Sequence, residues 1–168
     1  MLRHLFPRLT PAPSRGSALF AALVGEARAT HWFVEGGVPD TLDGRFAMLS
    51  TIVALATVRL ERGGAEAQAA SVALAERFVE AMDAEHRQLG IGEPGIGKTV
   101  RKLVGALARR VEYWRGAVDG GDWGAAVEAS LGGAASAAGV QHCDVALRDL
   151  WDRLERTADE ALADGRIE

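Results

Sequence analysis

Apolar residues recur every three or four positions along most of this chain, and that spacing restricts it to helices. One stripe consists of Phe46, Leu49, Val53, Ala56 and Leu60. A second consists of Val100, Leu103, Val104, Leu107, Val111, Trp114 and Val118. Residues three and four apart share a helix face, whereas a half-buried strand needs strict alternation. The sequence has no convincing alternating run and no internal repeat, so we predict an all-α fold.

Glycines, prolines and capping residues divide the chain into about six expected helices. We expect them at 17 to about 36, after a cap at Asp40 or Thr41 as far as 62, at 65–89, from Lys98 to 118, at 123–131 behind Asp122, and at about 140–164. A length of 168 residues suits one domain. We therefore expect a single helical domain over residues 15–168, with a flexible basic N-terminus at 1–14 and a flexible connection at 132–139.

Composition and charge exclude several classes of protein. The formal net charge of −4 argues against a dedicated nucleic-acid binder, which usually carries a basic surplus. The lone Cys143 excludes an internal disulfide and fits a reducing compartment. The longest apolar run, Phe46 to Val58, has thirteen residues and is too short to span a bilayer. We expect a soluble cytoplasmic protein that is at most peripheral to the membrane. The basic, apolar start either frays or contacts anionic lipid.

The stretch GEPGIGKT, residues 92–99, matches the phosphate-binding loop G-x-x-x-x-G-K-[ST]. Such a loop works between a buried strand and a helix, where its backbone N–H groups surround the phosphates. The residues before it, FVEAMDAEHRQLGI, are charged and helical in period. A small nucleotide-binding protein using Gly92, Gly97, Lys98 and Thr99 is therefore the alternative. The favoured interpretation is a corner between two helices.

Motifs for a metal or for catalysis lack their partners. Asp83 and His86 form a D-x-x-H pair, but a di-metal bundle needs a second such pair and further carboxylates. No nucleophile motif such as G-x-S-x-G is present. We therefore expect no enzyme activity, no metal and no cofactor.

Charges on the expected third and fourth helices are opposite in sign. The third carries Glu76, Glu80, Asp83 and Glu85, and the fourth carries Lys98, Arg101, Lys102, Arg109, Arg110 and Arg115. The two faces could pair with each other or be solvated, as surface charges commonly are. The alternative is a basic surface for a partner protein, RNA or anionic lipid.

Two stretches, GVPDTLDGRFAML at 37–49 and FVEAMDAEHRQLGIGEPGIGKTVRKL at 78–103, stand in the order of a known pair of motifs. They resemble the ubiquinol–cytochrome c chaperone family, bacterial relatives of the mitochondrial factor that helps to assemble cytochrome b into the bc1 respiratory complex. The matching positions are Val38, Pro39, Asp40, Thr41, Gly44, Arg45, Phe46, Phe78, Met82, Asp83, Arg87, Gly90, Gly92, Gly97 and Lys98. After Gly105, ALARRVEY lacks the aromatic and glycine residues of the family pattern, so the resemblance weakens.

This resemblance implies a non-enzymatic assembly chaperone that binds the cytochrome b apoprotein at the cytoplasmic face of the membrane. It implies that the glycine loop is a helix–helix corner. The partner-binding candidates are Asp40, Arg45, Phe46, Asp83, Arg87, Gly92, Gly97, Lys98, Arg101 and Lys102. Further expected contacts are the ribosome, near whose exit the mitochondrial relatives sit, or an anionic membrane surface. No DNA and no small-molecule substrate is expected, and the plain alternative is a helical interaction module with another client.

Overall fold

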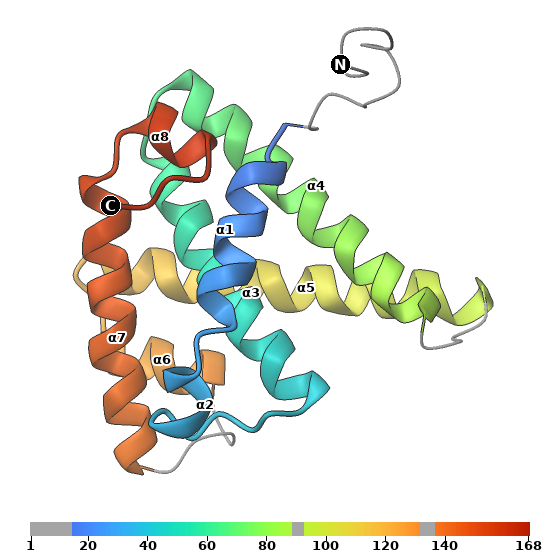
Figure 1. The fold of residues 1–168 in the computed structure, drawn as a ribbon, viewed down its shortest axis with the longest axis horizontal. Helices are drawn as coiled ribbons and strands as arrows, with labels where there is room; N and C mark the ends of the chain where they lie inside the picture. Colours follow the sequence, from blue (N-terminus) through green and yellow to red (C-terminus); the bar gives the residue numbers. More distant parts are fainter. Residues whose placement is uncertain (1–14, 89–92, 132–136) are drawn as a thin grey trace, which may run out of the picture.

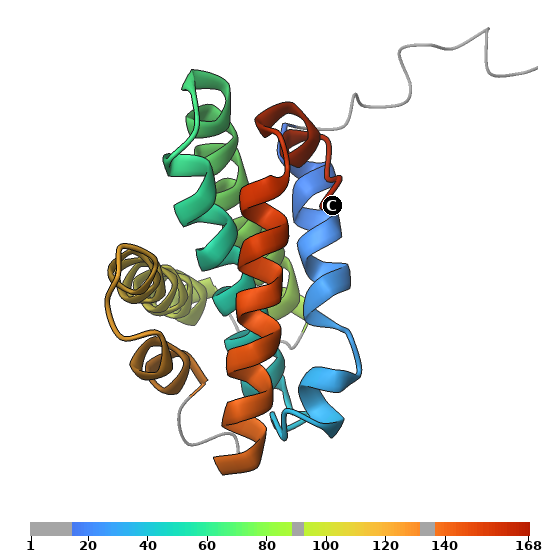
Figure 2. The same ribbon diagram turned by 90° about the vertical axis from the view of Figure 1, so that its left-hand side faces the viewer.

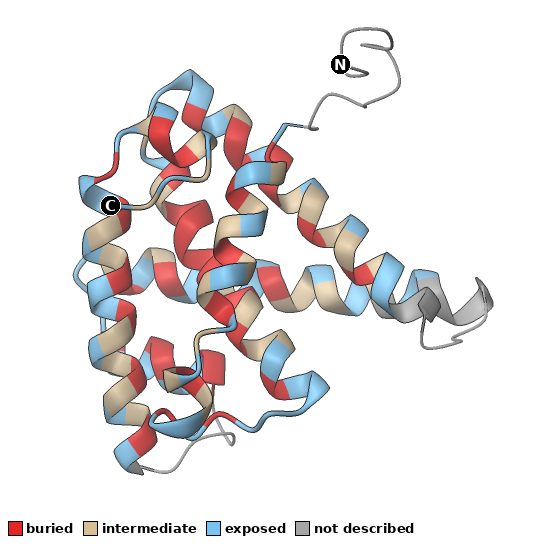
Figure 3. Ribbon diagram, viewed as in Figure 1, coloured by how far each residue is buried: buried red, intermediate tan, exposed pale blue. Residues whose placement is uncertain are grey.

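Helix α3, Leu42–Glu61, is the centre of the structure and is buried on every side along its middle. All nine residues from Ser50 to Val58 are buried, so the single apolar stripe expected here is too narrow a description. A helix can be enclosed in this way only when neighbours cover its whole circumference. In the computed structural model, α3 is in contact with α1, α4, α5, α6 and α7 (Figure 1). Figure 3 shows the buried residues concentrated along it.

Three hydroxyl side chains inside α3 satisfy their hydrogen-bonding groups within the helix. Ser50 donates to the carbonyl of Phe46 at 2.7 Å, Thr51 to that of Ala47 at 2.7 Å, and Thr57 to that of Val53 at 2.8 Å. Burying a hydroxyl without such a partner costs about 1–3 kcal/mol. These bonds let a helix with polar residues occupy the core.

The structure describes residues 15–88, 93–131 and 137–168. In these ranges it has eight helices, six of them longer than one or two turns, and no strand, which confirms the all-α single domain. Besides α3 they are α1 (Ser17–Ala27), α2 (His31–Val34), α4 (Ala65–Gln88), α5 (Glu93–Val118), α6 (Trp123–Leu131), α7 (Ala137–Arg156) and α8 (Asp159–Ala163). Helices α1, α3 and α7 lie side by side, and α5 runs across them (Figures 1 and 2). The N-terminal residues 1–14 and most of the expected connection at 132–139 lie outside the described residues.

The first expected helix is wrong as a single element, because it breaks into α1 and α2. The break turns Trp32 into the core, where it is 0% exposed. Its indole N–H donates to the carbonyl of Glu26, at the end of α1, over 2.9 Å. A continuous helix separates positions six apart by about 9 Å along its axis, so this bond needs the break.

The last expected helix is likewise divided, into α7 and α8, and a side chain from α3 explains the division. Arg59 donates to the carbonyls of Leu154 at 3.0 Å and Thr157 at 2.8 Å, groups at the end of α7. The same guanidinium pairs with Asp159, the first residue of α8, at 2.9 Å. Asp159 also accepts the backbone N–H of Gly64, and these two bonds, the backbone one first, lower its carboxyl pKa.

The corner between α4 and α5 differs from the expectation in where the second helix starts. Helix α5 begins at Glu93 rather than at Lys98, so Pro94, Gly95 and Gly97 stand in its first turns. Proline is tolerated there because the first N–H groups of a helix have no partner inside it. No helix within residues 15–88, 93–131 and 137–168 combines the length and the apolar character needed to cross a membrane.

Removing the Arg59 side chain tests its role as the clamp between the centre and the C-terminal helices. We expect Arg59→Met to lower the free energy of unfolding by about 2–4 kcal/mol, because buried carbonyls and a carboxylate lose a charged donor. The matched Arg62→Met breaks an exposed ion pair to Asp119 and should cost less than about 1 kcal/mol. Urea unfolding of both variants measures this, and equal losses would contradict the clamp.

Candidate partner-binding groove

The turn before α3 is held by its own side chains. Of the two caps expected here, Asp40 and Thr41, Thr41 is the N-cap and accepts the backbone N–H of Gly44 at 3.2 Å. Arg45 Nε lies 2.6 Å from Asp40 Oδ1, and this hydrogen bond lowers the pKa of the Asp40 carboxyl. A Cβ placed on Gly44 would stand 2.0 Å from the carbonyl oxygen of Pro39. Glycine is therefore required where the chain folds back against the start of the helix.

Phe46, in the first turns of α3, points its ring between α4 and α5. Its ring centroid is 6.0 Å from that of Phe78 in α4. The Arg110 guanidinium of α5 stands 5.9 Å over the same ring. Arg110 also donates to the carbonyl of Ser130 at 2.9 Å, and burial lowers the pKa of its guanidinium. Phe46 thus joins the core to the wall of a hollow.

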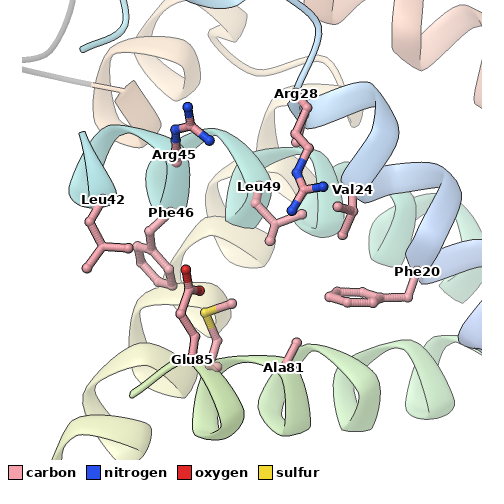
Figure 4. A pocket seen from close by; sticks show the side chains of 11 residues that line it. Phe20, Val24, Arg28, Leu42, Arg45, Phe46, Leu49, Ala81 and Glu85 are labelled. Carbon is pink, nitrogen blue, oxygen red and sulfur yellow. The ribbon is translucent and has the colours of Figure 1, made fainter. Parts of the chain in front are cut away.

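The hollow is a groove of about 270 Å³ between α1, α3 and α4. Its surface is largely apolar, with charged residues at the rim. The lining consists of Phe20, Val24, Ala27, Arg28, Leu42, Arg45, Phe46, Leu49, Ala81, Met82 and Glu85 (Figure 4). A second hollow of about 200 Å³ shares Arg28 and Arg45 with it and extends the groove towards Phe33 and Val34 of α2. Val34 and Leu42 are 75% and 49% exposed, unusually open for large apolar side chains.

The structure brings only part of the expected site together. Asp40, Arg45 and Phe46 lie at the groove, and Asp83 is half-buried next to the lining residue Met82. Gly97, Lys98, Arg101 and Lys102 are exposed on α5 and do not line the groove. Gly92 and the side chain of Arg87 lie outside the described residues.

Sequence reasoning missed the wall that α1 contributes. Phe20, Val24 and Arg28 follow one another at helical spacing, the signal of one face, but nothing local shows that this face meets α3 and α4. Glu85 was assigned only to an acidic face. The contact is tertiary, so only the folded chain reveals it.

Among the described residues, the basic residues of α5 form no ion pair with Glu76, Glu80 or Glu85 of α4. Arg115 reaches Glu61 of α3 at 2.7 Å and also Glu112, while Glu80 pairs with Arg77 of its own helix. Arg110 turns inward. The remaining basic residues, Lys98, Arg101, Lys102 and Arg109, are exposed and have no ion pair within the described part of the chain.

Groups with reactive chemistry lie elsewhere and are inert or mutually bonded. Burial raises the pKa of the Cys143 thiol to about 11, so it stays protonated at neutral pH. His31 Nδ1 lies 3.0 Å from His142 Nε2, and burial first, then His142, lowers the His31 pKa. Among the described residues, no three His, Cys, Asp or Glu side chains converge on a common point that could hold a metal ion.

Comparison with known proteins identifies the family. Residues 34–168 match the profile described as ubiquinol-cytochrome C chaperone. The chain belongs to this family. It is also similar to the crystal structure of the Cbp3 homolog from Brucella abortus, with 28% sequence identity and a TM-score of 0.78 over 100% of this chain and 96% of that one. No curated protein matches.

The position of GEPGIGKT in this chaperone agrees with a helical corner. Residues 65–88, which precede it, form α4 where a phosphate-binding loop needs a strand. From Glu93 onwards the motif is the first part of α5. Lys98 and Thr99 therefore stand inside a helix, after its free N–H groups.

Filling the turn at Gly44 should destabilise the chaperone. We expect Gly44→Ala to cost about 1–3 kcal/mol, because the new methyl group meets backbone rather than a movable side chain. Gly25 offers the control, since its added Cβ meets nothing within 4 Å and alanine there should gain about 0.5–1 kcal/mol. Thermal unfolding distinguishes the two, and a neutral Gly44→Ala would contradict the role given to the Pro39 carbonyl.

Proposed function

We propose that this chaperone binds newly made cytochrome b and assists assembly of the cytochrome bc1 complex, holding an apolar segment of the apoprotein in the groove between α1, α3 and α4. The observation that carries the proposal is an open apolar groove at the turn whose residues resemble the family motif. Membership of the ubiquinol-cytochrome C chaperone family supports the choice of complex.

The groove suits temporary protection of a membrane protein. Before insertion, apolar side chains of such a client face water, and covering one large side chain is worth about 1.5–3 kcal/mol. The groove has room for only a few groups, so each contact is weak enough to be released. Leu42, at the edge of the groove, and Val34, in the adjoining hollow, are exposed and extend its apolar surface. A chaperone that must hand over its client needs this kind of modest affinity.

Holding and releasing a client needs no chemistry from the protein. Binding and release of a polypeptide require neither a cofactor nor a metal. The chaperone would act in the cytoplasm, at the inner face of the plasma membrane. There the exposed basic residues Lys98, Arg101, Lys102 and Arg109 favour contact with an anionic partner, either the ribosome or the lipid surface.

Deletion of the gene tests the function directly. In cells with a bc1-dependent respiratory chain, we expect the reduced-minus-oxidised spectrum of the membranes to lose the bc1 b-type haem signal. The wild-type gene should restore it, and other cytochromes should keep their signals. A deletion strain with an unchanged spectrum would contradict the proposal. Binding of magnesium and ATP or GTP, lost in Lys98→Ala, would then favour the nucleotide alternative.

The basic face of α5 can be tested separately from the groove. We expect Lys98→Glu with Arg101→Glu to weaken capture of newly made cytochrome b about tenfold or more, because the net charge of the face that would contact the ribosome or the lipid surface changes by four units. Far-UV circular dichroism should keep its helical signal. The matched pair Arg156→Glu with Arg166→Glu changes the same charge on exposed residues away from this face and should leave capture unaltered. Unchanged capture by the first pair would remove α5 from the site.

A further inference from the structure

The two arginines at the groove differ in whether their charge is already neutralised. Arg45 is held by Asp40 at 2.6 Å. Arg28, the C-cap of α1, is exposed, and its guanidinium has no hydrogen bond or ion pair among the described residues. Figure 4 shows its side chain extending over the groove between Val24 and Leu49. An unpaired cation therefore stands at the edge of an apolar surface.

The position of Arg28 in α1 does not explain this orientation. A basic side chain at a helix C-terminus commonly interacts with the last carbonyl groups. Here the carbonyls of Gly25 and Glu26 accept backbone N–H groups of Arg28 and Ala29, and that of Glu26 also accepts the Trp32 indole. These two carbonyls are thus bonded without the guanidinium, which lines both adjoining hollows instead.

The charge across the groove has the opposite sign. Glu85 of α4 is exposed and lines the larger hollow, with its carboxylate directed towards Phe46 (Figure 4). Arg45 is paired with Asp40 and also interacts electrostatically with Glu85 on the α4 wall, so Arg28, on the α1 wall, is the cation of the groove that has no partner among the described residues. An occupant is therefore favoured in one orientation, with its anionic end at α1.

We propose that Arg28 binds a carboxylate of the client segment, an Asp or Glu within about one helical turn of a large apolar side chain that fills the hollow. This inference rests on the proposed function and adds which segments the groove accepts. The bound segment would cover Arg28 and exclude water, which strengthens a guanidinium–carboxylate pair. A guanidinium presents two parallel N–H donors to a carboxylate, so lysine replaces it incompletely.

Capture of newly made cytochrome b by the purified full chain tests the carboxylate contact. We expect Arg28→Gln to reduce capture about tenfold or more, as the loss of a charged hydrogen-bonded pair does, with Arg28→Lys between it and the wild type. The melting temperature should change little, because the exposed Arg28 guanidinium makes no hydrogen bond or ion pair among the described residues. Arg156→Gln is the matched control, an exposed arginine at the end of α7 with no ion pair among the described residues, and should capture normally.

A photo-crosslinker identifies the bound segment itself. Leu42, which lines the groove and is 49% exposed, is replaced by p-benzoylphenylalanine. The crosslinked cytochrome b peptide is then mapped by mass spectrometry. We expect an acidic residue within four positions of the crosslinked apolar side chain, and loss of the crosslink in Arg28→Gln. Full capture by Arg28→Gln, or crosslinks confined to segments without an acid or to lipid, would overturn the carboxylate contact while leaving the chaperone function. Absence of cytochrome b capture by the wild type would overturn both.

Discussion

The whole structure depends on burying α3 from every side. A helix with this little polar surface is stable only when others surround it, and five neighbours do so. Two features offset the free-energy cost of burying the polar groups of α3. Its hydroxyls form hydrogen bonds inside the helix, as Thr57 does. Arg59, its most buried charged residue, donates to carbonyls at the end of α7 and pairs with Asp159 at the start of α8. Because those carbonyls lie nearly one hundred positions later in the chain, the centre cannot form fully until the C-terminal helices have docked.

The groove exists because this enclosure is incomplete at one end. At this end the space between α1 and α4 is left open and is lined by four residues of α3, which are Leu42, Arg45, Phe46 and Leu49. The same few residues serve two purposes: Phe46 packs on Phe78 and under Arg110, while it also lines the groove. The site is therefore the open edge of the core itself, and its apolar lining is inherited from the pattern that makes the helix.

The sequence predicts the helices well and their tertiary contacts poorly, because the signals that it contains are local. Apolar stripes, capping residues and glycines are local signals, so the all-α fold could be predicted, and so could two helix caps. Thr41 accepts the N–H of Gly44, and Asp122 accepts the N–H of Ala125 at 2.9 Å. The divisions of the first and last helices depend on Trp32 reaching Glu26 and on Arg59 reaching Leu154, contacts that no periodicity contains. The resemblance directed attention to Asp40, Arg45 and Phe46 but not to the α1 wall, because a motif records one segment and a groove needs three. It also placed Lys98 and Arg101 with the turn residues, although α5 presents them on another surface.

The turn residues and Arg28 contribute to the groove in physically different ways. Asp40 and Arg45 form an ion pair with each other, and the absence of a side chain at Gly44 lets the Pro39 carbonyl lie against the start of α3. These residues therefore shape the wall of the groove. Arg28 and Glu85 are exposed and contribute charge rather than structure. A substitution in the turn must therefore change folding and binding together, since the shape of the hollow follows from the fold. The charges at the rim can change without altering the stability of the fold. The rim is therefore the part of the groove whose selectivity among client segments is least constrained by stability.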